Sequence, residues 1–342
     1  MKKRDSKFEL LRLAIMFGIV VGHYLCHGGV LNKGNLCNRI VSGIMSIYGG
    51  KTSNLIFVMI SAWFLSDREE LHSINNKTIL LVIRCMVFSI GGYLASVLIS
   101  GECISIGMLY KSFATSISGY GFLMCYILML TVAPVLNIIL NKMSKEILET
   151  LIFSALVFTL LSKLAYDVQA IVIFTEIYLL IGYIKKYAIN EINRKTIVVI
   201  GIINMLCIIF AEVTGFILNV ENPVFMIDNE NDITVIVNAL FFFLLVVKLP
   251  DIYIDNINFV SSGIIYVYLI HENSWIRPLL WEKLKAPLFY NSPFMIIHCL
   301  LCSLIVMIVG LTIGMIYGIF ENHVVKILLI SIEKRMKKYL LE

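Results

Sequence analysis

Two ionisable residues, Arg12 and His23, lie in the first long apolar stretch of the chain, residues 8–30. Such a stretch can cross a bilayer, whose hydrocarbon core needs about 20 apolar residues. Ionisable groups cost about 2.5–3.5 kcal/mol each at the centre of a spanning helix, so their presence indicates a functional site. Eleven positions make about three helical turns plus roughly 20°, which puts both side chains on one face, roughly 16 Å apart along the axis. This geometry suits the two ends of one elongated ligand.

The same two residues also have a structural interpretation. Arg12 can extend to the headgroups or pair with Glu9, three residues earlier on the same helix face. His23 can serve as a buried hydrogen-bonding group between helices. His27, one turn after His23, either assists it or faces water.

Composition places the chain among integral membrane proteins. Of its 342 residues, 59% are hydrophobic and only 15% are charged, and the mean hydropathy is +0.89. Soluble domains usually carry about 25% charged residues. The net charge of +5 does not indicate nucleic-acid binding, because the basic residues lie at helix ends and in short loops, where they orient membrane proteins.

We predict an all-α, polytopic membrane bundle with about ten spanning helices. The segments are 8–30, 41–65, 79–100, 119–140, 147–165, 169–187, 196–219, 233–249, 259–277 and 294–320. An even number of spans puts both termini on one side. Both are basic, as are the loops predicted on that side, so the positive-inside rule places them in the cytoplasm. Residues 1–342 form one domain with a core at 8–320, and 321–342 form a basic cytoplasmic tail.

Polar residues in the second and fourth segments are candidates for a substrate site. In the second segment, Gly49 and Gly50 predict a broken helix, and Ser61 lies in the apolar run that follows. A hydroxyl in a helix is also satisfied by a carbonyl one turn earlier, so Ser61 has a local explanation too. In the fourth segment, Tyr126 either binds a sugar or packs between helices.

Further candidates come from the sixth and ninth segments. Glu176 lies in the middle of the sixth segment, where a carboxyl group must be neutral, paired or facing water. The ninth segment carries Tyr268, His271 and Glu272 together, which either bind a sugar hydroxyl or anchor the helix at headgroup level. Glu212, near the end of the seventh segment, is interpreted as an interface residue.

The eight cysteines mostly lie in apolar segments and are expected to pack as small hydrophobic residues. Cys299 and Cys302 have a metal-like spacing beside His298, but no second pair accompanies them. We therefore expect no metal. Cys37 and Cys103 fall in predicted outer loops, where they are free to pair or to remain reduced.

An Arg followed, after ten residues, by a His in the first spanning helix resembles the acyltransferase family 3 membrane proteins. Three more runs are similar to segments of that family: SNLIFVMISAWFLSD, in which Ala62 replaces the usual Gly, GYGFLMCYILMLTVAPVLN, and GIIYVYLIHE. The resemblance implies a multi-pass protein of the cell membrane. It also implies that Arg12 and His23 are the essential pair in moving an acyl group, usually acetyl, onto a cell-surface polysaccharide or lipid-linked sugar.

The expected chemistry follows from these residue types. Histidine is the natural general base near neutral pH, so His23 is assigned to the acceptor hydroxyl. The guanidinium fork of Arg12 suits phosphates, so it is assigned to acyl-coenzyme A, the acetyl-CoA type of donor, on the cytoplasmic side. Glu9, Ser61, Tyr126, Glu176, Tyr268, His271 and Glu272 are the expected substrate-binding residues. The alternative function is a transporter or flippase for a lipid-linked saccharide, which needs no general base.

Overall fold

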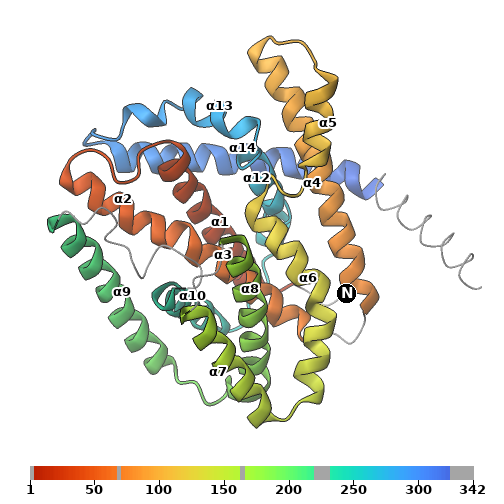
Figure 1. Cartoon of the computed structure of the whole chain (residues 1–342), viewed down its shortest axis with the longest axis vertical. Helices are drawn as coiled ribbons and strands as arrows, with labels where there is room; N and C mark the ends of the chain where they lie inside the picture. The colour runs from red at the N-terminus through yellow and green to blue at the C-terminus, as the bar shows by residue number, and fades with distance from the viewer. Residues whose placement is uncertain (1–3, 68–70, 162–165, 219–231, 324–342) are drawn as a thin grey trace, which may run out of the picture.

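The computed structural model describes residues 4–67, 71–161, 166–218 and 232–323, and within these ranges all regular secondary structure is helical (Figure 1). The first half contains α1 (Ser6–His27), α2 (Leu36–Gly49), α3 (Lys51–Leu65), α4 (Leu71–Ser100), α5 (Ile106–Ala114), α6 (Gly121–Lys142) and α7 (Lys145–Leu161). The second half contains α8 (Tyr166–Tyr183), a π-helical turn (Ile184–Ala188), α9 (Arg194–Ile217), α10 (Ile233–Val247), α11 (Asp255–Ser261), α12 (Ile264–His271), α13 (Ile276–Lys283), a 3₁₀ turn (Ala286–Leu288) and α14 (Met295–His323).

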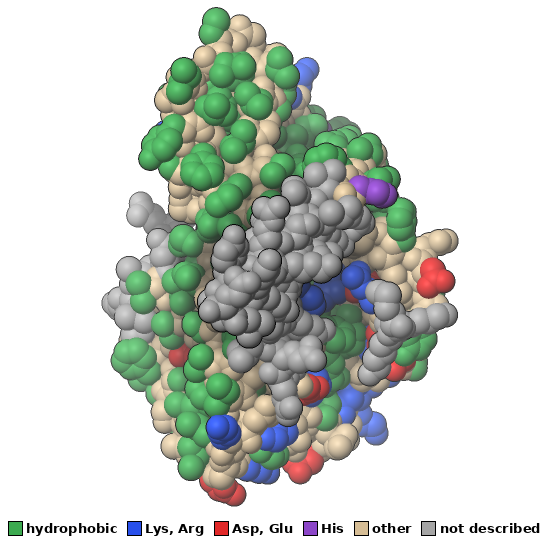
Figure 2. Space-filling view, turned by 90° about the vertical axis from the view of Figure 1, so that its right-hand side faces the viewer, with side chains coloured by type: hydrophobic (Ala, Val, Ile, Leu, Met, Phe, Trp, Pro, Cys, Tyr) green, Lys and Arg blue, Asp and Glu red, His purple; other side chains and the backbone are tan. Residues whose placement is uncertain are grey.

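Six helices in the described ranges are long and apolar enough to cross a membrane: α1, the 77–100 part of α4, α6, the 168–188 stretch around α8, α9 and α14. Their burial differs, since 61% of the apolar window of α1 is buried in the protein but only 22% of that of α4. Figure 2 shows apolar side chains covering the hairpin of α4 and α5 that projects from the bundle. Such apolar surface fits lipid better than water, consistent with a helical membrane bundle.

Close helix contacts fix α1 at the centre. Gly18 and Gly22, four residues apart on α1, face the junction of α2 and α3; a Cβ atom on Gly22 would lie 3.2 Å from the backbone nitrogen of Gly50. Small residues at this spacing let two backbones approach closely. The junction itself is the predicted break, because α2 ends at Gly49 and Gly50 has the non-helical angles φ −91° and ψ −94°.

A second glycine pair holds α12 against α14. A Cβ atom on Gly310 would lie 2.9 Å from the Cα of Val267, and one on Gly314 would lie 2.6 Å from the ring of Tyr266. These close contacts leave no room for larger side chains.

The predicted ninth span, 259–277, is not one helix in the structure. It contains the end of α11 at Ser261, all of α12 from Ile264 to His271, and the start of α13 at Ile276.

The basic tail predicted at 321–342 lies outside the described ranges from residue 324 onward. The cysteines lie as follows in the structure: Cys299 and Cys302 are buried, and Cys37 and Cys103 are exposed and not joined to each other. The Sγ atom of Cys302 lies 3.5 Å from Nε2 of His298, whose Nδ1 is 2.7 Å from the Tyr24 hydroxyl. These groups pack between α14 and α1.

Candidate functional site

Two cavities open along one face of α1. The histidine cavity, of about 520 Å³, is bordered by His23, His27 and Glu272. The arginine cavity, of about 530 Å³, is bordered by Arg12 and by cations from other segments: Arg4, Lys77 and Arg84. Arg12 and His23 therefore face the same side of the helix, as their spacing predicts, but they border different spaces.

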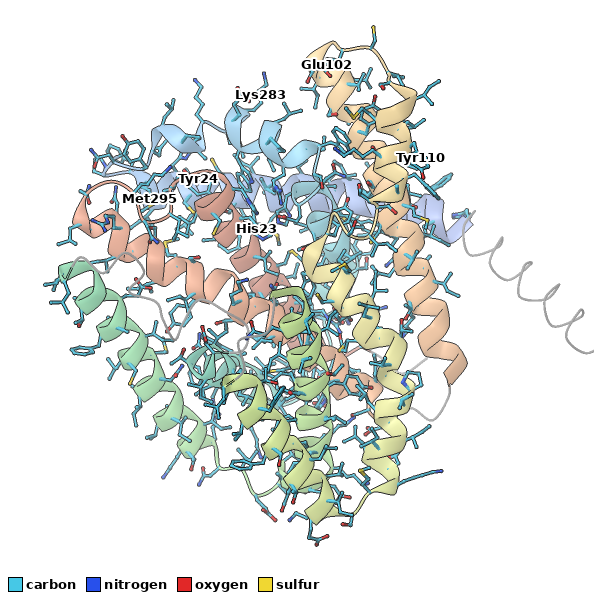
Figure 3. All side chains as sticks on the ribbon, viewed as in Figure 1. His23, Tyr24, Glu102, Tyr110, Lys283 and Met295 are labelled. Atoms are coloured by element: carbon cyan, nitrogen blue, oxygen red, sulfur yellow. The ribbon has the colours of Figure 1, made fainter. Side chains whose placement is uncertain are left out.

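His23 is held by two groups from the end of α12. Its Nδ1 atom lies 2.8 Å from Oε2 of Glu272 and 2.9 Å from Nε2 of His271. Figure 3 shows His23 in the interior of the bundle. The structure thus unites three predicted site residues that the sequence keeps far apart, since His23 and His271 are separated by 248 positions.

The hydrogen bonds define which nitrogen of His23 is free to act as a base. Nδ1 of His271 lies 2.6 Å from the Val267 carbonyl, which can only accept, so this nitrogen carries a proton and neutral His271 presents Nε2 as an acceptor. Both neighbours of the His23 Nδ1 atom are then acceptors, and that atom must donate. The remaining nitrogen of neutral His23, Nε2, consequently carries the lone pair.

Glu272 is a buried carboxylate with cationic partners. Arg277 donates to its Oε1 atom, and Nε2 of His27 lies 3.6 Å from the same oxygen. Only 7% of Glu272 is exposed, and a buried charge of this kind is tolerated when it is paired and hydrogen-bonded. The carboxylate therefore connects both histidines of α1 to the arginine of α13.

The turn that presents Glu272 is fixed by Asn273. Its side-chain oxygen accepts from the backbone nitrogens of Trp275 at 3.0 Å and of Ile276 at 3.3 Å. Its Nδ2 atom donates to the Phe88 carbonyl and to the Tyr120 hydroxyl, each at 2.9 Å. Asn readily ends a helix by making such local bonds, and here it also ties the turn to α4 and α6.

The histidine cavity also offers metal-ligand chemistry. His23, His27 and Glu272 present ligand atoms within 4.8 Å of one another, and two His plus one Glu is a known zinc-binding set. Arg277 also contacts Glu272, so a cation bound here would share this carboxylate with the arginine.

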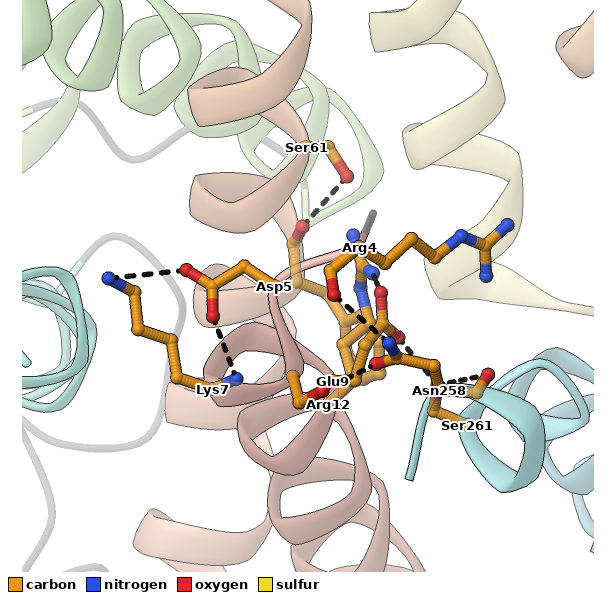
Figure 4. A network of polar contacts seen from close by, with 10 residues as sticks. Arg4, Asp5, Lys7, Glu9, Arg12, Ser61, Asn258 and Ser261 are labelled. Atoms are coloured by element: carbon orange, nitrogen blue, oxygen red, sulfur yellow. Dashed lines mark hydrogen bonds and ion pairs between the residues drawn. The ribbon is translucent and has the colours of Figure 1, made fainter. Parts of the chain in front are cut away.

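Arg12 belongs to a polar network at the start of α1 (Figure 4). It donates to Oε1 of Glu9 at 2.5 Å, and the other carboxylate oxygen of Glu9 accepts from the Ser261 hydroxyl at 2.7 Å. Glu9 is buried whereas Arg12 borders the arginine cavity. Glu9 thus orients the arginine, which confirms the predicted pairing, and the site role of Arg12 stays a prediction.

Ser61 and Tyr126 border the arginine cavity, not the histidine cavity. The Ser61 hydroxyl donates to the Phe57 carbonyl at 2.9 Å and accepts from the Tyr126 hydroxyl at 2.7 Å. The local explanation of Ser61 therefore applies, although its position on the cavity wall leaves it beside any ligand there.

Glu176 is separate from both groups. It is buried, and the Thr159 hydroxyl donates to its Oε1 atom at 2.6 Å. It borders neither the histidine cavity nor the arginine cavity. The structure accordingly places it in a contact between α7 and α8, away from the other predicted site residues.

Sequence reasoning missed two charged residues that border these cavities, Glu212 and Arg84, and a third, Arg277, that contacts Glu272. Glu212 is fully buried and borders the histidine cavity, which corrects its interpretation as an interface residue. Arg277 binds Glu272, as described above. Arg84 borders the arginine cavity and donates to both oxygens of Glu321, at 2.7 and 2.6 Å. A lone arginine inside the apolar segment 79–100 was itself a signal for Arg84.

Comparison of the chain with protein-family models, with curated proteins and with solved structures finds no match.

Proposed function

We propose that the protein is an O-acyltransferase of the cell membrane that moves an acyl group, usually acetyl, from acyl-coenzyme A to a hydroxyl group of a surface polysaccharide or lipid-linked sugar. The observation that supports this best is the contact of His23 with Glu272 at the wall of a cavity. A histidine whose Nδ1 faces a carboxylate, while its Nε2 carries the lone pair, is an arrangement that supports general-base catalysis. The proposal includes about ten spans with both termini in the cytoplasm.

In this mechanism His23 handles the proton of the acceptor. Its Nε2 atom takes the hydroxyl proton while the hydroxyl oxygen attacks the thioester carbonyl, and Glu272 stabilises the resulting imidazolium. The new C–O bond forms and the C–S bond breaks. The proton then passes from His23 to the thiolate, which leaves as the free thiol of coenzyme A. Each proton removed from the acceptor is thereby returned to the leaving group.

The arginine cavity is the proposed donor site. Coenzyme A carries several phosphates, and Arg4, Arg12, Lys77 and Arg84 bring four cations to this cavity. Arginine binds phosphate oxygens through charge-assisted hydrogen bonds. The roughly 16 Å rise from Arg12 to His23 along the helix suits the elongated pantetheine arm of the donor.

The histidine cavity is the proposed acceptor site. Besides its histidines it presents polar side chains of Asn32, Ser46 and Asn54 together with the rings of Phe122 and Tyr268. Sugars are bound by such a mixture, because hydroxyl groups need hydrogen-bond partners and the ring faces pack on apolar surface.

A transporter for a lipid-linked saccharide is the second candidate, because two cavities that share a wall also suit alternating access. It would not require His23 as a base.

The deciding experiment is transfer of radiolabelled acetyl from acetyl-CoA in membranes that contain the protein and its acceptor. His23→Ala is expected to reduce the rate by about 100-fold or more at equal membrane insertion. His323→Ala, which alters an exposed histidine at the end of α14, is the matched control and should retain the rate. Full activity of His23→Ala would refute the mechanism, and absence of transfer by the wild type together with saccharide movement would favour the transporter.

A further inference from the structure

A thin partition separates the two cavities. Ile19, Phe122 and Tyr268 border both of them. Ile19 lies on α1 between Arg12 and His23, about 10 Å along the axis from the first and about 6 Å from the second, at roughly 1.5 Å per residue. Phe122 belongs to the first turn of α6 and Tyr268 to α12. Side chains from three helices thus close the space between the cationic site and the base.

Phe122 is the centre of this partition. Its ring centroid lies 5.7 Å from that of Tyr268, 5.6 Å from that of Tyr126 on the arginine side and 5.6 Å from that of Phe174 on the histidine side. Ile19 and Tyr268 are 1% and 4% exposed, whereas Phe122 is only partly buried. Because close packing restricts rotamer changes, Phe122 has the most freedom of the three to swing aside.

The partition lies across the route that the donor must take. The phosphate-binding cations border one cavity, whereas His23 borders only the other. A thioester bound by those cations reacts at His23 only after its acyl end passes Ile19 and Phe122. The acyl group enters the partition before the rest of the donor, so the width of the acyl group determines how far the partition must open.

We propose that Phe122, together with Ile19 and Tyr268, gates the passage of the acyl thioester to His23 and that the bulk of Phe122 restricts transfer to narrow acyl groups. The inference rests on the proposed acyltransferase function. Acetyl passes this gate with a small displacement of the Phe122 ring, whereas a branched group such as isobutyryl is hindered by it. The gate also keeps water in the histidine cavity away from the thioester stored in the arginine cavity.

The test compares the kcat/KM of isobutyryl-CoA with that of acetyl-CoA in membranes. Phe122→Ala is expected to raise the isobutyryl-to-acetyl ratio by about tenfold or more, the scale of discrimination that a few methyl groups provide. Phe122→Leu and Ile19→Ala should raise it to a smaller extent. Phe88→Ala is the matched control: Phe88 is also partly buried and contacts two aromatic rings, those of Tyr266 and Tyr317, but borders neither cavity.

The outcomes distinguish failure of the proposed gate from failure of the proposed acyltransferase function. A wild-type protein that transfers acetyl, together with inserted Phe122 and Ile19 variants that keep the wild-type ratio, would overturn the gate alone. Loss of all acetyl transfer in properly inserted Phe122→Leu and Ile19→Ala proteins would also overturn it, since a wider passage must still admit acetyl. A wild type that transfers neither acyl group would overturn the proposed function itself.

Discussion

The histidine and arginine cavities have nearly equal volumes, about 520 and 530 Å³, but different charges border them. The histidine cavity is bordered by two carboxylates, Glu212 and Glu272, together with Lys51 and two histidines. The arginine cavity is bordered by cations, whereas Glu9 and Glu321, the carboxylates that pair with Arg12 and Arg84, do not border it. A carboxylate beside a histidine favours proton transfer, whereas forward-facing cations favour an anionic ligand. One face of α1 thus borders two cavities of different charge.

Replacing Glu272 by Gln should have the largest effect on activity, and it alters only the histidine cavity. The side chain keeps its shape but loses the charge that stabilises a protonated His23, so kcat for acetyl transfer should fall by about 100-fold while KM for acetyl-CoA changes little. Steady-state kinetics in membranes measure both values.

Glu176→Gln is the matched control for this variant, since it neutralises a buried carboxyl group that borders neither cavity. It should leave kcat unchanged. An equal loss of kcat in both variants would mean that Glu272 acts through stability and not through His23.

Removing Arg12 should weaken binding of the acyl donor and leave binding of the acceptor unchanged. The double variant Glu9→Gln/Arg12→Ala removes the pair together, so that no unpaired buried carboxylate remains. We expect KM for acetyl-CoA to rise about tenfold, within the range for one charge-assisted hydrogen bond, with KM for the acceptor unchanged. An increase in the acceptor KM instead would reverse the assignment of the two cavities.

The smallest expected effect concerns the anchor at the start of α1. Nζ of Lys7 donates to Oδ1 of Asp251 at 2.8 Å, and this hydrogen bond holds the pKa of Asp251 below its ordinary value. A lowered carboxyl pKa contributes stability above the unfolded-state value, and this contribution is lost as the pH falls through the folded-state pKa. Asp251→Asn should therefore lower the thermal unfolding midpoint slightly at pH 7.

The same comparison at acidic pH provides the check. In detergent, the midpoints of wild type and Asp251→Asn should converge as the pH falls through the carboxyl pKa, whereas acetyl transfer at pH 7 should be unaffected. A difference in midpoint that stays constant with pH would show that Asp251 acts by packing and not by its charge.

Local pattern was sufficient for several features. Apolar stretches of spanning length predicted helices throughout the chain, and the spacing of Arg12 and His23 predicted their common face, because helical geometry depends only on local backbone angles. The Gly49–Gly50 pair likewise predicted the break between α2 and α3. The division of the ninth segment among α11, α12 and α13 was missed.

Other features required the folded chain. Helix packing alone brings Glu272 to His23, buries Glu212 at a cavity wall and pairs Arg84 with Glu321. The sequence determined which residues carry charge within apolar helices. It did not determine their partners, because a buried charge is stabilised by whichever group the tertiary structure brings within a few ångströms, however distant that group is along the chain.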